Sequence, residues 1–63
     1  MKLHEIEEGK RFKIPTLFTE EKKMFKGKVN RQGEGAVLVT YDHLPYTPLT
    51  ISLMTEVERD DEN

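Results

Sequence analysis

The most constraining feature of this chain is a pair of alternating apolar stretches on either side of one turn. Residues 23–31 place an apolar or small residue at every second position, and residues 36–42 repeat this spacing. A period of two is typical of a β-strand with one buried face. The turn NRQGEG holds Gly33 and Gly35, and a glycine can adopt a positive φ angle without a Cβ penalty. The sequence therefore predicts a β-hairpin, and Gly27 within its first strand predicts a bend or bulge.

The N-terminal part predicts one helical turn and one short strand. Leu3 and Ile6 are three residues apart and Gly9 follows them, as expected for a helical turn that ends at a glycine. A single turn is not stable alone, so we expect its two apolar side chains to plug one end of a core. Residues 10–14 alternate between charged and apolar side chains and predict a strand that ends, or lies at a sheet edge, at Pro15.

The remaining segments predict loops and two further strands. Residues 16–22 read as a loop, because the pattern after TEEKK has a period of two rather than that of a helix. Residues 42–48 contain two prolines and predict a connection to a strand at 49–52. A tight turn then leads to a short last strand centred on Val57, and the acidic residues 60–63 are expected to be a frayed tail.

These elements predict an all-β fold, with about five short antiparallel strands and one N-terminal helical turn in a small barrel. The 63 residues allow one domain, which we place at residues 1–59. The chain has no cysteine, so packing or association must stabilise it. The predicted core consists of Leu3, Ile6, Phe12, Ile14, Phe25, Val29, Val37, Val39, Tyr41, Leu49, Ile51, Leu53 and Val57.

The layout resembles the SH3-like class of small barrels. The resemblance rests on Gly9 before the first strand, the long loop after Pro15, the central hairpin KGKVNRQGEGAVLV and the one-turn element in SLMTEVE. The stretches EEGKRFKIP and TISLMTEVE are similar to small uncharacterised proteins of bacteriophages and prophages, which implies such an origin. The proline-peptide groove of signalling barrels is not implied, because the chain has no tryptophan.

The charges are segregated along the chain. Residues 9–33 hold eight basic and two acidic side chains, whereas residues 34–63 hold one basic and seven acidic. Two interpretations follow: a bipolar surface, or mutual neutralisation of the halves across paired strands.

Several functional classes are disfavoured by the residue types alone, and we expect a cytoplasmic, non-enzymatic protein. His4, His43 and Ser52 are widely spaced in the sequence, and a pocket of several hundred Å³ is hard to build in so small a domain. Asp42 beside His43 is too few ligands for a structural metal site, so no metal and no cofactor is expected. No apolar run approaches the roughly 18 residues of a membrane span, and the N-terminus lacks the apolar stretch of a signal peptide.

Protein binding is the leading functional prediction. The candidate interface residues are Leu17 and Phe18 in one loop and Leu44 and Tyr46 in another. Apolar side chains in loops mark an interface when they are contiguous. The alternatives are that these loops fold over the barrel ends, or that an open strand edge pairs with another strand. The short core also allows a homodimer.

Nucleic-acid binding is the alternative. Lys26, Lys28 and Asn30 share the outward face of one predicted strand, and Arg31 with Gln32 is expected to crown the turn. Strand geometry separates the two lysines by about 7 Å, close to the phosphate spacing of an extended strand. No aromatic residue shares that face for base stacking, and the sequence pI of 5.6 is low for a dedicated nucleic-acid binder.

Overall fold

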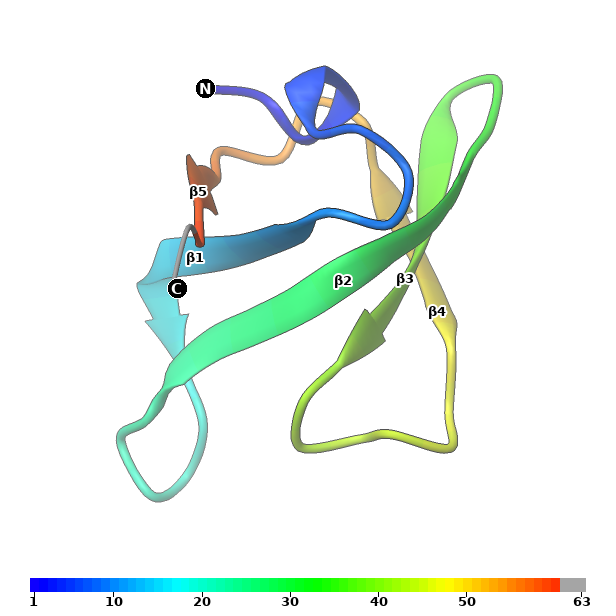
Figure 1. Ribbon diagram of the computed structural model, residues 1–63. Coiled ribbons are helices and arrows are strands. Elements are labelled where there is room, and N and C mark those ends of the chain that lie inside the picture. The colour runs from blue at the N-terminus through cyan, green and yellow to red at the C-terminus, as the bar shows by residue number, and fades with distance from the viewer. Residues whose placement is uncertain (61–63) are drawn as a thin grey trace.

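Five antiparallel strands form one strongly bent sheet in the order β4-β3-β2-β1-β5 (Figure 1). The computed structural model describes residues 1–60. Its elements are the 3-10 turn η1 (Leu3–Glu5) and strands β1 (Arg11–Phe18), β2 (Met24–Gln32), β3 (Ala36–Tyr41), β4 (Leu49–Ser52) and β5 (Glu58–Arg59). The predicted all-β class with one N-terminal helical turn is confirmed.

Strand β2 is the central strand of the sheet, because it pairs with β1 along one edge and with β3 along the other. Gly27 lies opposite Phe12 on β1 and opposite Tyr41 on β3. A Cβ atom on Gly27 would lie 2.6 Å from the Thr40 carbonyl oxygen, so this glycine is required by close strand approach. The predicted bulge at Gly27 is wrong, since the register shift falls between Val29 and Arg31.

Strand β1 continues through Pro15, so of the two predicted alternatives the strand end is wrong and the sheet edge is confirmed. The loop assigned to residues 16–18 is also wrong. The strand tolerates the proline because β5 pairs only with Phe12 and Lys13. Beyond Lys13 that side of β1 is a free edge, where a missing N–H breaks no ladder bond. The register with β2 also shifts between Ile14 and Phe18, where the strand bends.

The N-terminal segment runs beside the connection between β4 and β5 (Figure 1). The Leu3 N–H donates to the Thr55 carbonyl (2.9 Å), and the Val57 N–H donates to the Met1 carbonyl (2.8 Å). Within residues 1–60, β4 and β5 themselves are not paired, so this segment covers the open side of the sheet. Gly9 does not end the helical turn as predicted; it lies in the next turn, with φ +84°.

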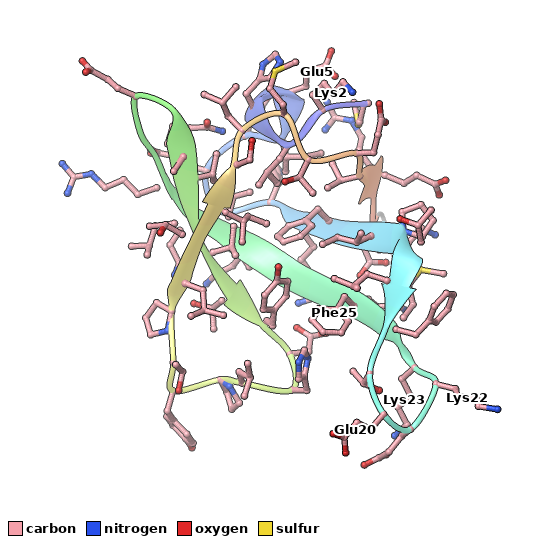
Figure 2. All side chains as sticks on the ribbon, turned by 180° about the vertical axis from the view of Figure 1, so that it is seen from behind. Lys2, Glu5, Glu20, Lys22, Lys23 and Phe25 are labelled. Atoms are coloured by element: carbon pink, nitrogen blue, oxygen red, sulfur yellow. The ribbon has the colours of Figure 1, made fainter. Side chains whose placement is uncertain are left out.

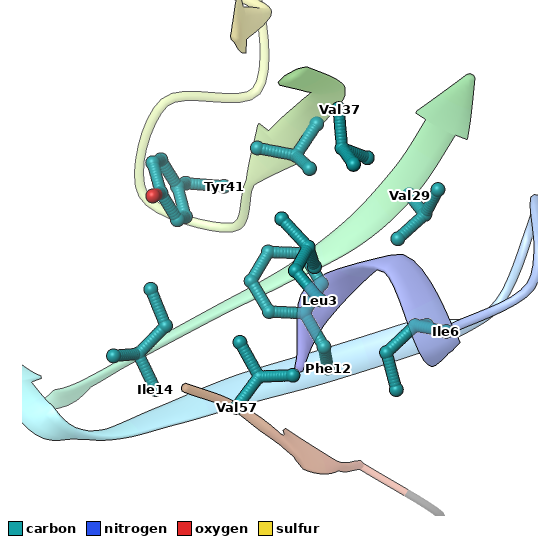
Figure 3. Close-up of a cluster of buried hydrophobic side chains, with 9 residues drawn as sticks. Leu3, Ile6, Phe12, Ile14, Val29, Val37, Tyr41 and Val57 are labelled. Carbon is teal, nitrogen blue, oxygen red and sulfur yellow. The ribbon is translucent and has the colours of Figure 1, made fainter. Parts of the chain in front are cut away.

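The core lies between the bent sheet and the helical turn (Figure 3). Leu3 and Ile6 are fully buried, which confirms their predicted role as a plug. The buried apolar residues are Leu3, Ile6, Phe12, Ile14, Val29, Val37, Val39, Tyr41 and Val57, with Phe25, Ile51 and Leu53 packed against them. Leu49 was also predicted in the core, but it is 38% exposed because it begins the edge strand β4.

Residue 60 was predicted as the start of a frayed tail, but it is part of the folded domain. The side chain of Asp60 is only 2% exposed, and its carboxylate pairs with the Arg11 guanidinium. The Asp60 N–H also donates to the Arg11 carbonyl, which fastens it to β1. Asp60 therefore belongs to the domain, and the rest of the predicted tail, residues 61–63, lies outside the described residues. No helix in residues 1–60 is long and apolar enough to cross a membrane.

Candidate binding groove

The β1–β2 hairpin extends beyond the body of the sheet (Figure 1). It forms one wall of an open groove. The tip is held by Thr19, whose N–H donates to the Lys23 carbonyl and whose hydroxyl accepts from the Lys23 N–H. Lys22, at the apex, has a positive φ of 62°. No helix forms over TEEKK, as expected. The segment after β3 forms the opposite wall of the groove.

The groove has a volume of about 1090 Å³ and is open to solvent, so it is a surface concavity rather than the enclosed pocket that so small a domain was expected not to build. The volume arises from the projecting hairpin rather than from a hollow in the core. Its lining residues are Phe18, Thr19, Glu20, Glu21, Lys23, Met24, Phe25, Lys26, Asp42, His43 and Leu44. Phe25 points between the hairpin tip and the β3–β4 connection in Figure 2.

Aromatic rings connect the groove to the core. The Phe25 ring lies 4.5 Å from the His43 ring and 5.0 Å from the Tyr41 ring, edge-on in both pairs. The His43 ring stacks on the Tyr41 ring at 5.6 Å, and Tyr41 in turn meets Phe12 in the core at 6.2 Å. Burial raises the pKa of the Tyr41 hydroxyl, so this residue stays neutral at physiological pH. The wall formed by Phe25 and His43 is therefore anchored to the most buried part of the molecule.

Of the four predicted interface residues, two line the groove and two do not. Phe18 and Leu44 line it from opposite walls, although they are far apart in the sequence, and they are 51% and 37% exposed. Leu17 and Tyr46 are also exposed but do not line it. Leu17 is the strand neighbour of Phe18, and neighbours on a strand point to opposite faces. Tyr46 projects from a turn in which the Thr47 N–H donates to the Leu44 carbonyl.

Sequence reasoning did not assign Phe25 and His43 to an interface. Phe25 was predicted in the core, and His43 was considered only for catalysis or metal binding. The aromatic character of Phe25 and His43 was the only available signal. Their proximity depends on how the end of β3 lies against β2, where the Asp42 N–H donates to the Lys26 carbonyl.

The rim of the groove is charged. Glu21 pairs with Lys23 at 3.5 Å, and Asp42 pairs with Arg11. Within residues 1–60, Glu20 has no ion-pair partner. The rim therefore presents one carboxylate that is available to a ligand, beside an apolar wall.

Of the basic candidate residues, Lys26 lines the groove, whereas Lys28, Asn30 and Arg31 do not. The register places Arg11 opposite Lys28 and Lys13 opposite Lys26, so β1 adds two basic side chains to those of β2. Asn30 lies at the bulge of β2 and donates from its side-chain amide to the Thr40 hydroxyl.

Arg31 and Gln32 belong to β2 rather than to the turn, which corrects the prediction that they crown it. Gln32 has a structural role, because its side-chain amide donates to the Ile6 carbonyl and its N–H donates to the Glu8 carboxylate. Arg31 lies opposite Leu38 and is exposed.

Carboxylates of the acidic half neutralise two of these basic side chains. Arg11 lies between Asp42 and Asp60, and the Lys13 ammonium is 4.0 Å from the Glu58 carboxylate. The interpretation of mutual neutralisation across paired strands therefore holds for Arg11 and Lys13.

The residues considered for metal binding or catalysis are not gathered into one site. No group of three or more His, Asp or Glu side chains within residues 1–60 is placed to hold a metal ion. Asp42 is engaged by Arg11, and the Ser52 hydroxyl accepts a hydrogen bond from the Met54 N–H.

Comparison of the chain with protein-family models, with curated proteins and with solved structures finds no match. The groove is therefore interpreted from its own chemistry.

Proposed function

We propose that this chain is a non-enzymatic module that binds a short peptide segment of a partner protein in the groove. The observation that carries the proposal is the convergence of Phe18 and Leu44 on one groove with Phe25 as its aromatic wall. Exposed apolar side chains that are contiguous and rimmed by charge are typical of interaction sites.

The shape and chemistry of the groove define the class of ligand. An apolar or aromatic side chain of the peptide would pack against Phe18, Phe25 and Leu44. A neighbouring lysine or arginine would face the carboxylate of Glu20 on the rim. Because the contact area of a single groove is small, we expect a dissociation constant of about 1–100 μM. The origin in a bacteriophage or prophage, and a role as an accessory protein, are part of this proposal and rest on the sequence resemblance.

The test uses peptides selected from a random dodecamer display library against the folded protein. The selected peptides are synthesised and titrated into isotope-labelled protein while amide NMR shifts are recorded. Phe18→Ala should weaken binding at least tenfold, whereas the matched change Leu17→Ala should alter it less than twofold. Both residues are exposed on β1, but only Phe18 lines the groove. Peptides whose binding depends on Leu17 or Tyr46 instead, or a library that yields no binder, would reject the groove as the site.

Nucleic-acid binding remains a second candidate because of one observation. Like charges face each other across β1 and β2 in the pairs Arg11 with Lys28 and Lys13 with Lys26. Directly opposed like charges destabilise a sheet, so their presence favours a role in binding anions. This candidate ranks second because carboxylates lie beside Arg11 and Lys13.

The second candidate is tested by the fluorescence anisotropy of a labelled mixed-sequence single-stranded oligonucleotide. Binding should weaken steeply with salt and at least tenfold in a variant carrying Lys28→Glu and Arg31→Glu. A variant carrying Lys22→Glu and Lys23→Glu makes the same change in charge at the hairpin tip and serves as the control. Equal losses in the two variants would indicate non-specific attraction, and an oligonucleotide that does not bind at low salt would exclude the candidate.

A further inference from the structure

The β4 strand (Leu49–Ser52) lies at one end of the sheet with an open edge (Figure 1). One side of β4 pairs with β3, from Leu49 opposite Val39 to Ser52 opposite Ala36. Directly after β4, the Ser52 carbonyl accepts from the Thr55 N–H in a tight turn. Within residues 1–60 no other strand pairs with β4. Unpaired N–H and C=O groups along a strand edge form a template for another strand.

The other free edges of the sheet carry charge or proline, and β4 carries neither. Strand β5 is two residues long and consists of Glu58 and Arg59, both charged. The part of β1 that extends past β5 contains Pro15. Short length, charge and proline are the devices by which natural sheets prevent edge pairing. Strand β4 reads LTIS and has neither charge nor proline.

The surface around β4 is neutral in an otherwise highly charged chain. Residues 44–55 form a continuous stretch without a charged side chain, although 35% of the chain is charged. This stretch leaves apolar side chains exposed, with Leu49 at 38% and Met54 at 56%. A strand that pairs with this edge should therefore be uncharged and rich in residues that favour β-structure. Strand β4 of a second copy of the chain meets both conditions.

We propose that β4 pairs antiparallel with β4 of a second copy of this chain. A twofold axis perpendicular to the sheet at Thr50 would set Thr50 beside the partner's Thr50 and Leu49 beside the partner's Ile51, so that opposed side chains share a face. Such an isologous contact is self-complementary, brings no charges together and joins the two sheets into one. It also covers Leu49, which has the sequence pattern of a core residue but is exposed in the single copy. None of the groove-lining residues lies in β4, so this pairing is independent of the proposed peptide site.

The test measures the mass of the full chain by light scattering coupled to size exclusion, from about 10 μM to about 1 mM, where weak dimers dissociate. We expect the mass to rise from 7.4 kDa toward twice that value as the concentration rises. Thr50→Lys places a charge in the centre of the edge and should raise the dimer dissociation constant at least tenfold. Thr16→Lys introduces the same charge at an exposed position on β1 and should leave the constant within twofold.

Amide hydrogen exchange of the unmodified chain provides a measurement that does not depend on a variant folding correctly. Outward-facing amides of residues 49–52 should exchange at least tenfold more slowly at the high concentration than at the low one. A constant mass of 7.4 kDa over the whole range would overturn the proposal. So would a dimer that Thr50→Lys leaves unchanged, or one in which protection appears on β1 or β5 instead of β4.

Discussion

Arg11 on β1 forms an ion pair with Asp60, and this pair allows a quantitative prediction. Its Nε lies 3.3 Å from the Asp60 carboxylate, and its terminal nitrogen pairs with Asp42. The hydrogen bond to Asp42 is the main cause that raises the pKa of Arg11, and burial opposes it. The two carboxylates differ in environment, because the Asp60 side chain is 2% exposed and the Asp42 side chain is 51% exposed.

We predict that replacing Arg11 lowers the free energy of unfolding more than replacing Asp60 does. Arg11→Gln removes the only ion-pair partner that Asp60 has within residues 1–60 and leaves a buried carboxylate. An unsatisfied buried polar group costs about 1–3 kcal/mol, and the exposed Asp42 adds less than about 1 kcal/mol. We therefore expect Arg11→Gln to lower the free energy of unfolding by about 2 kcal/mol, a large part of the roughly 3–5 kcal/mol available to a domain of this size.

Asp60→Asn should cost less than about 1 kcal/mol, because Arg11 is half exposed and keeps Asp42 and water as partners. The amide oxygen that this change introduces would also accept from the Arg11 Nε. The double variant should therefore be close to Asp60→Asn alone, since no buried charge remains without a partner.

The assay is urea and thermal unfolding followed by circular dichroism at neutral pH. A loss of about 2 kcal/mol corresponds to a fall of about 8–16 °C in Tm for a domain of this length. Equal losses for Arg11→Gln and Asp60→Asn, or a double variant that is the least stable of the three, would refute the reasoning.

Two further predictions concern single positions. Gly27→Ala should lower the free energy of unfolding by about 1–3 kcal/mol in urea unfolding, because its Cβ would force β2 away from the Thr40 carbonyl; an unchanged midpoint would contradict this. Hydrogen bonds from Lys2 and the N-terminal ammonium lower the pKa of Glu56 below its ordinary value of 4.5. Glu56 therefore stabilises the fold above that pH, and its contribution is lost as the pH falls through the lowered pKa. Glu56→Gln should accordingly reduce Tm at pH 7, and the reduction should become smaller as the pH falls below 4.5. A reduction in Tm that does not change with pH would exclude the ion pair as the cause.

Much of the fold could be predicted because its pattern is local. Alternation placed Val37, Val39 and Tyr41 on one face of β3, and all three are buried. The strand predicted at 49–52 has the bounds observed for β4. Side chains on a strand alternate between faces whatever the strand pairs with, so apolar periodicity reports burial directly.

The errors occurred where the outcome depends on a neighbouring segment. Pro15 lies within β1 because β5 is too short to reach it. Leu49 is exposed because β4 is an edge strand, and Asp60 is buried because Arg11 lies beside it. None of these neighbours is specified by the local pattern.

The sequence by itself indicated the strands, although β1 continues past its predicted end and the last strand is Glu58–Arg59 rather than one centred on Val57. It also indicated the apolar plug formed by Leu3 and Ile6 and the apolar character of Phe18 and Leu44. Only the tertiary structure placed Phe18 and Leu44 on one groove and left Leu17 and Tyr46 outside it. The physical reason is that alternation is a property of consecutive residues, whereas the meeting of distant segments depends on strand register, bulges and twist. A shift in the register of β1 on β2 would have moved Phe18 away from the groove without altering the apolar pattern that predicted the strands.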